Sequence, residues 1–145
     1  MVSRIRAGGL SVLAIASLAF LAANLVHTAD HLRQGTGRLS IEILVAGTGL
    51  TLAALATVPF AVRRDPRAPL FAAIVGLPGA VGIAAAHIAP HWSALSDPYP
   101  GNGLDALSWA VVLLEIGAAA VLGLVGVREL RRAERLPGRA AASTS

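Results

Sequence analysis

The sequence predicts an all-α integral membrane protein, a four-helix transmembrane bundle with both termini in the cytoplasm. Three observations lead to this prediction. The 145 residues are 55% hydrophobic and 14% charged, whereas ordinary soluble domains carry about 25% charged residues. The apolar residues form four runs of about twenty residues, the helix length that crosses a bilayer core roughly 30 Å thick. The arginines cluster at one end of these runs.

The four runs define a single transmembrane domain over residues 1–134, with helices expected at about 8–27, 41–62, 68–90 and 105–128. In lipid, every backbone polar group needs a partner inside the protein, so runs of this length should be helical. The first run resembles a signal peptide, but it exceeds the usual ~7–15 apolar residues, and we interpret it as the first span. Residues 135–145 are predicted to be a disordered C-terminal tail.

The arginines predict the orientation. Arg33 and Arg38 lie on one side of the expected membrane, and the other ten arginines lie on the opposite side. Arginine in short loops stays in the cytoplasm, which predicts a multi-pass protein of the inner (plasma) membrane with the N- and C-termini inside. The absence of lysine and the abundance of alanine and glycine are typical of a GC-rich bacterial genome, so we expect a bacterial source.

The histidines follow the first and third apolar runs, so this topology places them all at the outer face. Each pair is four residues apart and should share one helix face. Two such pairs on facing helices would supply three or four nitrogen ligands, and imidazole binds zinc, copper, iron and nickel. The sequence therefore predicts a divalent transition metal, zinc or copper before iron or haem, at His27, His31, His87 and His91.

Three residues are candidates for catalysis. Asp30 is next to His31 and could ligate the metal, orient a ligand histidine or form an acid–base pair with His31. Glu115 lies halfway along the fourth run, where a carboxylate costs roughly 2.5–3.5 kcal/mol on insertion scales. It is interpreted either as a proton or substrate group or as a packing hydrogen bond between helices.

The connection from residue 91 to 105 is rich in proline and glycine, which is typical of turns. It is interpreted either as a lid over a pocket at the outer helix ends or as a simple connection. Aromatic residues near it are expected at the outer interface, and Asp105 could instead be the N-cap of the fourth helix. The candidates for substrate binding are Asn24, Trp92, Asp97, Tyr99, Asp105 and Trp109.

Glycine recurs in the second and third runs, and small residues let helices approach closely in lipid. We therefore expect tight helix packing at Gly47, Gly49, Gly76, Gly79 and Gly82. Pro78 is expected to kink the third helix.

Three function classes remain open from the sequence, and whether the protein is an enzyme is one of the open points. The first is a metal-binding site, or an active site for a lipid-phase substrate. The second is a cofactor-free acid–base membrane enzyme. The third is an accessory or transport subunit that uses Glu115 as an intramembrane polar or proton site. Besides the bilayer, the expected partners are a lipid-phase small molecule and further copies or other membrane subunits.

The sequence also excludes several kinds of site. There is no cysteine, which excludes disulfides, iron–sulfur clusters and thiolate metal sites. The arginines lie at the ends of apolar runs rather than on a basic face of the kind that binds nucleic acid, so no nucleic-acid partner is expected.

Overall fold

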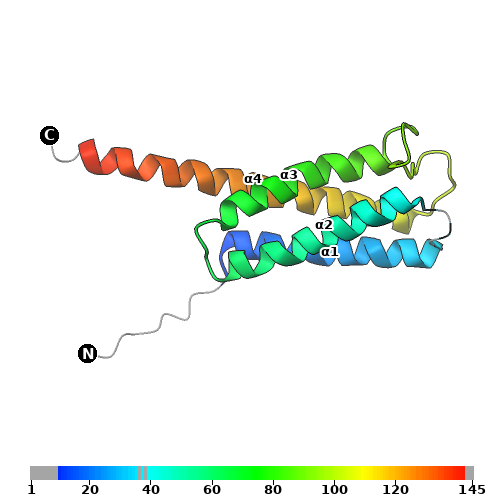
Figure 1. Cartoon of the computed structure of the whole chain (residues 1–145), viewed down its shortest axis with the longest axis horizontal. Helices are drawn as coiled ribbons and strands as arrows, with labels where there is room; N and C mark the ends of the chain where they lie inside the picture. Colours follow the sequence, from blue (N-terminus) through cyan, green and yellow to red (C-terminus); the bar gives the residue numbers. More distant parts are fainter. Residues whose placement is uncertain (1–9, 36, 38, 143–145) are drawn as a thin grey trace, which may run out of the picture.

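The computed structural model describes residues 10–35, 37 and 39–142, and this part of the chain contains four helices and no strand. The helices run alternately up and down and lie side by side (Figure 1). They are α1 (Val12–Gln34), α2 (Ile41–Val62), α3 (Ala68–His87) and α4 (Ala106–Ala142). The all-helical class and the four-helix arrangement predicted from the sequence are confirmed.

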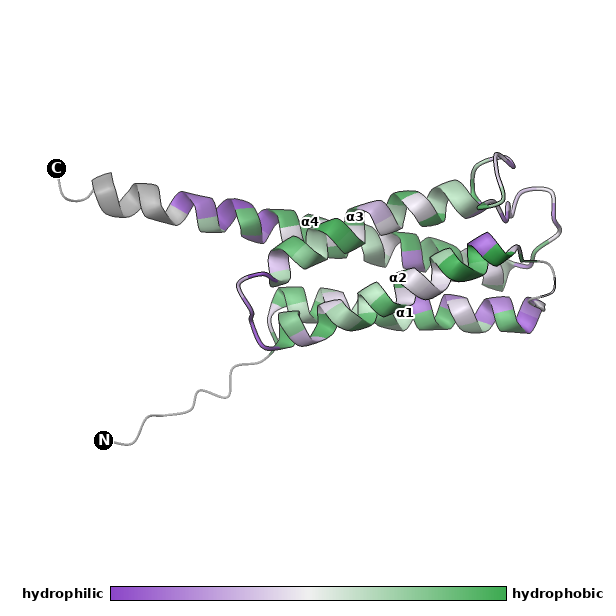
Figure 2. Ribbon diagram, viewed as in Figure 1, coloured by the Kyte–Doolittle hydropathy of each residue, from purple (hydrophilic) through white to green (hydrophobic). Residues whose placement is uncertain are grey.

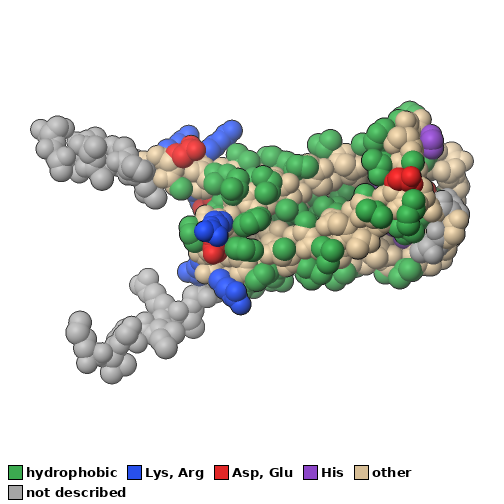
Figure 3. Space-filling view, in the orientation of Figure 1, with side chains coloured by type: hydrophobic (Ala, Val, Ile, Leu, Met, Phe, Trp, Pro, Cys, Tyr) green, Lys and Arg blue, Asp and Glu red, His purple; other side chains and the backbone are tan. Residues whose placement is uncertain are grey.

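All four helices are long and apolar enough to cross a membrane. Large apolar side chains point outward along them, with exposed fractions of 66% at Val45 and 70% at Val81. Figure 2 shows the apolar segments in the middle of the bundle, and Figure 3 shows apolar side chains spread over the face in view. An apolar exterior of this kind indicates a multi-pass membrane protein, because a soluble bundle would place polar side chains there.

All the described arginine side chains except that of Arg33 gather at the end of the bundle where α1 begins (Figure 3). They lie in the α2–α3 connection and on α4 beyond its apolar part, at Arg63, Arg64, Arg67, Arg128, Arg131, Arg132 and Arg135. Arg33 lies at the opposite end of α1. Arg4, Arg6 and Arg38, which also entered the predicted orientation, lie outside the described residues, and so does the side chain of Arg139.

Two helix ends differ from those expected at 27 and 90. α1 continues for about two more turns, to Gln34, and ends at Gly35, whose φ of 91° favours glycine. α3 ends at His87, because a residue that precedes proline, here Ala89 before Pro90, is biased away from the helical conformation. α2 has the expected bounds, and the Ser40 side chain caps it by accepting a hydrogen bond from the Ile43 N–H.

α4 is longer than expected, since it continues to Ala142 and so includes residues 135–142 of the expected disordered tail. The stretch that follows its apolar part is rich in arginine, glutamate, leucine and alanine, which are strong helix formers. Arg132 and Glu129 form an i,i+3 ion pair there, with 2.8 Å between nitrogen and oxygen. Residues 143–145 lie outside the described residues.

The tightest interface joins α3 and α4. A Cβ atom added at Gly76 would lie 2.6 Å from the Ala119 carbonyl oxygen, and one added at Gly126 would lie 2.6 Å from the Pro69 carbonyl oxygen. The backbones of the two helices are therefore in direct contact, as small residues allow in membrane bundles. α2 is the least buried of the four spans, and this leaves space between α2 and α3.

Candidate metal centre

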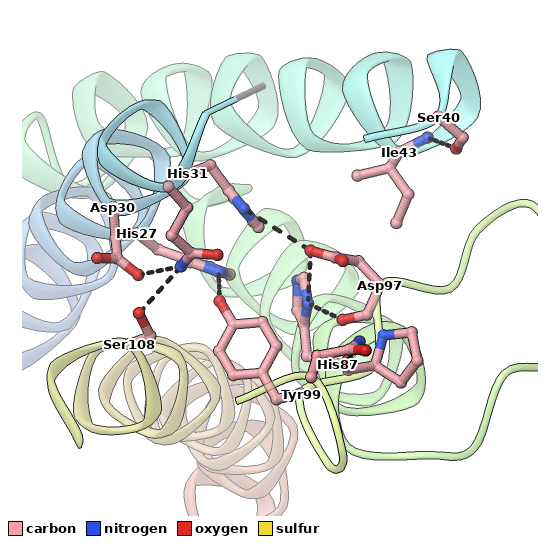
Figure 4. Close-up of polar contacts among 12 residues, drawn as sticks. His27, Asp30, His31, Ser40, Ile43, His87, Asp97, Tyr99 and Ser108 are labelled. Carbon is pink, nitrogen blue, oxygen red and sulfur yellow. Dashed lines mark hydrogen bonds and ion pairs between the residues drawn. The ribbon is translucent and has the colours of Figure 1, made fainter. Parts of the chain in front are cut away.

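Three of the four histidines converge inside the bundle, at the end opposite the arginines. His27 and His31 come from α1, and His87 is the last residue of α3. One ring nitrogen from each of the three lies within 4.8 Å of the other two. The ring centroids of His27 lie 4.5 Å from those of His31 and 4.9 Å from those of His87. His27 and His87 are each 5% exposed, and Figure 4 shows the three rings gathered with Asp97 and Tyr99 of the loop after α3.

The α1 pair meets because α1 continues past both residues, and side chains four apart on a helix lie on one face. The second pair does not behave in this way. α3 ends at His87, so His91 lies in the following loop, where it is exposed and outside the three-histidine group. His87 and His91 therefore share no helix face, although their spacing matches that of the α1 pair.

Glu115 lies beside this cluster and is 1% exposed. Its carboxylate accepts a hydrogen bond from Nδ1 of His27 and another, at 2.7 Å, from the Asn24 side-chain amide. The Asn24 side-chain oxygen in turn accepts a hydrogen bond from the Thr51 hydroxyl at 2.7 Å. A continuous polar chain thus runs from α2 through α1 to α4, and it fixes the orientation of the His27 ring.

The loop after α3 folds back over the cluster, as the lid interpretation expected. The backbone N–H of Asp97 donates to the Ala86 carbonyl at 2.9 Å, and that of Tyr99 donates to the His87 carbonyl at 2.8 Å. The Asp97 carbonyl accepts a hydrogen bond from Nδ1 of His87 at 3.1 Å. The Asp97 carboxylate lies 3.9 Å from Nδ1 of His31 and 4.0 Å from Nδ1 of His87.

Tyr99 is 1% exposed and closes the cluster from the loop side. Its hydroxyl lies 3.1 Å from Nε2 of His27. Burial raises the pKa of Tyr99 to about 12, so the phenol keeps its proton at neutral pH. Because Nδ1 of His27 donates to Glu115, Nε2 carries the lone pair and accepts the hydrogen bond from Tyr99. The Tyr99 ring also packs edge-on against Trp109, with 5.6 Å between the centroids.

Asp30 does not join the histidines. It is buried, but its carboxylate accepts hydrogen bonds from Arg33 at 2.8 Å and from Gln34 at 2.6 Å. Arg33 also pairs with Asp105 at 2.9 Å. A separate polar network therefore links α1 to the start of α4, and the expected role of Asp30 as a ligand or orienting group receives no support from its contacts.

Asp105 belongs to that network and also caps α4, as the alternative interpretation expected. Its carboxylate accepts a hydrogen bond from the Ser108 N–H at 2.9 Å. This bond, with that from Arg33, lowers the pKa of Asp105 below its usual value. Asp105 is exposed and lies apart from the three-histidine group.

A cavity of about 610 Å³ adjoins the cluster. Asn24, His27, His31, His87 and Glu115 lie along one wall of it, and mostly apolar residues of α2 and α3 form the rest. Trp92 also lines it and donates a hydrogen bond from its indole nitrogen to the Ala85 carbonyl at 2.9 Å. From their depth in the membrane, Ser17, Thr48 and Thr51 are expected to be neighbours of Glu115; Thr51 reaches it through Asn24, and Thr48 and Thr51 both line the cavity.

Of the residues expected at the site, the structure brings together His27, His31, His87, Glu115, Asn24, Asp97 and Tyr99, with Trp92 and Trp109 at its edge. It leaves Asp30, Asp105 and His91 outside. No protein-family model, curated protein or solved structure matches the chain.

Proposed function

We propose that this chain is an integral membrane protein that binds a divalent transition metal ion through His27, His31 and His87, and that the site handles a small molecule from the lipid phase. One observation carries the proposal: three imidazoles from two helices converge within 4.8 Å in a buried site. Three protein ligands with an open fourth position are the arrangement of catalytic zinc sites. Zinc or copper suits nitrogen donors best.

The contacts of the ring nitrogens support this ligand set. Histidines that bind metals almost always donate their second ring N–H to a carboxylate, a backbone carbonyl or water. His27 donates Nδ1–H to the Glu115 carboxylate, and His87 donates Nδ1–H to the Asp97 carbonyl. In both rings this directs the lone pair to Nε2, the nitrogen that remains to bind an ion. Tyr99, which bonds Nε2 of His27, would have to release it.

When bound, the ion supplies Lewis acidity to an oxygen atom of the small molecule. The chain's own residues do the rest. Glu115 and Asp97 hold two imidazoles in place, and Tyr99 and the loop that carries it separate the site from water. The Tyr99 hydroxyl, which lies beside His27, can donate a hydrogen bond to an oxygen placed there.

The orientation is part of the proposal. The arginines at the end where α1 begins support cytoplasmic termini, which puts the histidine cluster near the extracytoplasmic side of an inner (plasma) membrane in a bacterium. A reporter enzyme fused after Ser145 that works only in the cytoplasm should be active. Activity of a reporter that works only outside the cytoplasm would reverse the orientation.

The test of the metal site is elemental analysis of detergent-purified protein, with His31→Ala, His87→Ala and His91→Ala prepared in parallel. About one ion per chain is expected in the parent and in His91→Ala, because His91 lies outside the group. The other two variants should lose most of it, since one ligand of three is gone. A parent without transition metal, or equal retention in all three variants, would refute the site.

The bond between His27 and Tyr99 favours a second candidate, a cofactor-free acid–base site. Glu115, His27 and Tyr99 form a carboxylate–imidazole–phenol series that can pass a proton between the phenol and His27. This candidate predicts that the site works on a small molecule after all metal has been removed with a chelator. Elemental analysis therefore separates the two candidates.

A further inference from the structure

The cavity beside the histidines extends along two helices and is uneven in polarity. Its lining runs from Ile43 to Ala53 along α2 and from Ile74 to His87 along α3, which corresponds to about 15 Å and about 20 Å of helix. The histidines lie at one end, and the lining toward the middle of α3 is apolar. The volume of about 610 Å³ is within the range of about 300–1,000 Å³ for small-molecule pockets.

The mouth of the cavity opens sideways. Several of its lining residues are exposed on the outer surface of the bundle, at Leu44, Gly47 and Thr48 on α2 and at Ile74, Pro78 and Gly82 on α3. These positions lie within the apolar lengths of the two helices rather than in the connecting loops. In a membrane, a molecule would therefore enter between α2 and α3 from the lipid.

Two glycines at this mouth have no packing role. A Cβ atom added at Gly47 or Gly82 would meet nothing within 4 Å. Glycine costs roughly 1 kcal/mol relative to alanine inside a helix, and here no close helix contact offsets that cost. Space kept open on both sides of a cavity mouth is what passage or binding of a ligand requires.

We propose that this cavity takes a single-chain amphiphile from the bilayer, with its terminal oxygen donor at the histidines and its chain along α2 and α3. The inference rests on the proposed function, because the ion or the imidazoles receive that oxygen. The direction of the cavity supports this orientation of the ligand. In the leaflet at the histidine end, a lipid already has its polar group toward the histidines and its chain toward the bilayer centre. It can therefore enter the cavity without turning over.

The polar wall selects an oxygen donor rather than a cationic head. Glu115, the carboxylate on this wall, is already bonded to His27 and Asn24. The imidazoles that line this wall, or an ion bound to them, interact favourably with a hydroxyl or carboxyl group. Long-chain acids and alcohols share this chemistry, and a plain hydrocarbon lacks it.

The probe is hexadecanoic acid with a photoreactive diazirine on its chain, added to vesicles of phosphatidylcholine that hold the full-length protein. After illumination, mass spectrometry should find the label on the segments of α2 and α3 that line the cavity. Unlabelled hexadecanoic acid and hexadecan-1-ol should both compete, and hexadecane should not. Competition by hexadecane equal to that by the acid would overturn the proposal, since the oxygen end would then have no part in binding.

Matched variants make the test specific to the cavity. Gly47→Phe and Gly82→Phe place a ring in the mouth and should weaken labelling by about tenfold, or about 1.4 kcal/mol of binding free energy. Gly49→Phe is the control. Gly49 lies on α2, as Gly47 does, and an added Cβ there would meet nothing within 4 Å, but Gly49 does not line the cavity. Equal labelling in all three would refute the proposal.

Metal content and thermal unfolding of the same variants distinguish failure of the amphiphile proposal from failure of the metal proposal. Each variant should hold as much metal as the parent and unfold at the same temperature, because the added rings enter open space. A protein that holds its metal but is not labelled in the cavity refutes the amphiphile and leaves the metal site intact. Specific labelling of a protein that binds no metal refutes the metal site and assigns the oxygen to the imidazoles.

Discussion

The two faces of α3 use glycine in opposite ways. On the face toward α4, Gly76 brings the two backbones into contact, and an added Cβ would lie 2.6 Å from the Ala119 carbonyl. On the face toward α2, an added Cβ at Gly82 would meet nothing within 4 Å. One face is therefore closed by backbone packing, and the other is open beside the histidines. The same residue type stabilises the bundle in one place and leaves room for a ligand in the other.

This difference shows how a small-residue pattern should be interpreted. Five glycines in the second and third spans predicted tight packing, and the structure confirms it for Gly76 and for Gly79, where an added Cβ would lie 3.3 Å from the Leu50 side chain. It is wrong for Gly47, Gly49 and Gly82. The cost of helical glycine is the same at all five positions, so only the neighbouring helix decides between packing and open space.

Leucine substitution on each face of α3 should give the largest difference. Gly76→Leu forces a side chain into the α4 backbone and should lower the free energy of unfolding by about 3 kcal/mol or more, the upper range for overpacking. Gly82→Leu enters open space and should leave it unchanged or raise it by up to about 1 kcal/mol through helix propensity. Unfolding in detergent followed by circular dichroism measures both. Equal losses would show that the α2 side is also closed in solution.

Metal binding should stabilise the weak contact between α1 and α3. An ion held by His27, His31 and His87 would join these two helices, which pack against each other far less than α3 packs against α4. Zinc at a hundredfold excess over its dissociation constant should raise the free energy of unfolding by about 2.7 kcal/mol, and a chelator should remove the gain. The double variant His27→Ala, His87→Ala is the control. The same gain in that variant would place the stabilising ion elsewhere.

Hydrogen exchange locates this effect. Protection should increase near His27 and His31 in α1 and near His87 in α3, while the α3–α4 contact at Gly76 should change little. An increase spread evenly over all four helices would contradict a local bridge between α1 and α3.

Glu115→Gln should weaken the metal site without opening the bundle. Glutamine keeps the shape and can still bond Asn24, but it replaces the carboxyl group that His27 contacts with an amide. Loss of such an orienting partner typically lowers metal affinity about 10–100-fold. Competition with a chromophoric chelator measures it, and Thr51→Val, at the far end of the same polar chain, is the matched control. Equal affinity in the parent and in Glu115→Gln would leave Glu115 with a packing role alone.

Much of the architecture could be predicted from the sequence, because helix formation in four long apolar runs is a local property. The α1 histidine pair could be predicted too, since spacing on one helix fixes its geometry. The contact between Glu115 and His27 could not be predicted, because it depends on how α1 and α4 are rotated relative to each other. The prediction that His87 and His91 share a helix face was wrong. α3 ends at His87, because Pro90 disfavours helix in the residue before it, and His91 lies in the loop.

Asp30 shows a different limit of sequence reasoning. It is next to His31 in the chain, which made it a candidate ligand or orienting group. Consecutive residues on a helix point about 100° apart, whereas residues three apart are neighbours on its surface. Asp30 accordingly pairs with Arg33, at 2.8 Å, and not with His31.

Asp30→Asn should therefore have the smallest effect. The Arg33 side chain is 45% exposed, and partly exposed ion pairs contribute about 1 kcal/mol or less, so the free energy of unfolding should fall by no more than that. Metal content should equal that of the parent, because the contacts of Asp30 lead to Arg33 and Gln34 and away from the cluster. His31→Ala, one position further along α1, should lose the ion. Loss of metal from Asp30→Asn with the fold intact would show that the polar network at the α1–α4 end and the histidine centre act as one site, and Asp30 would return as an orienting group.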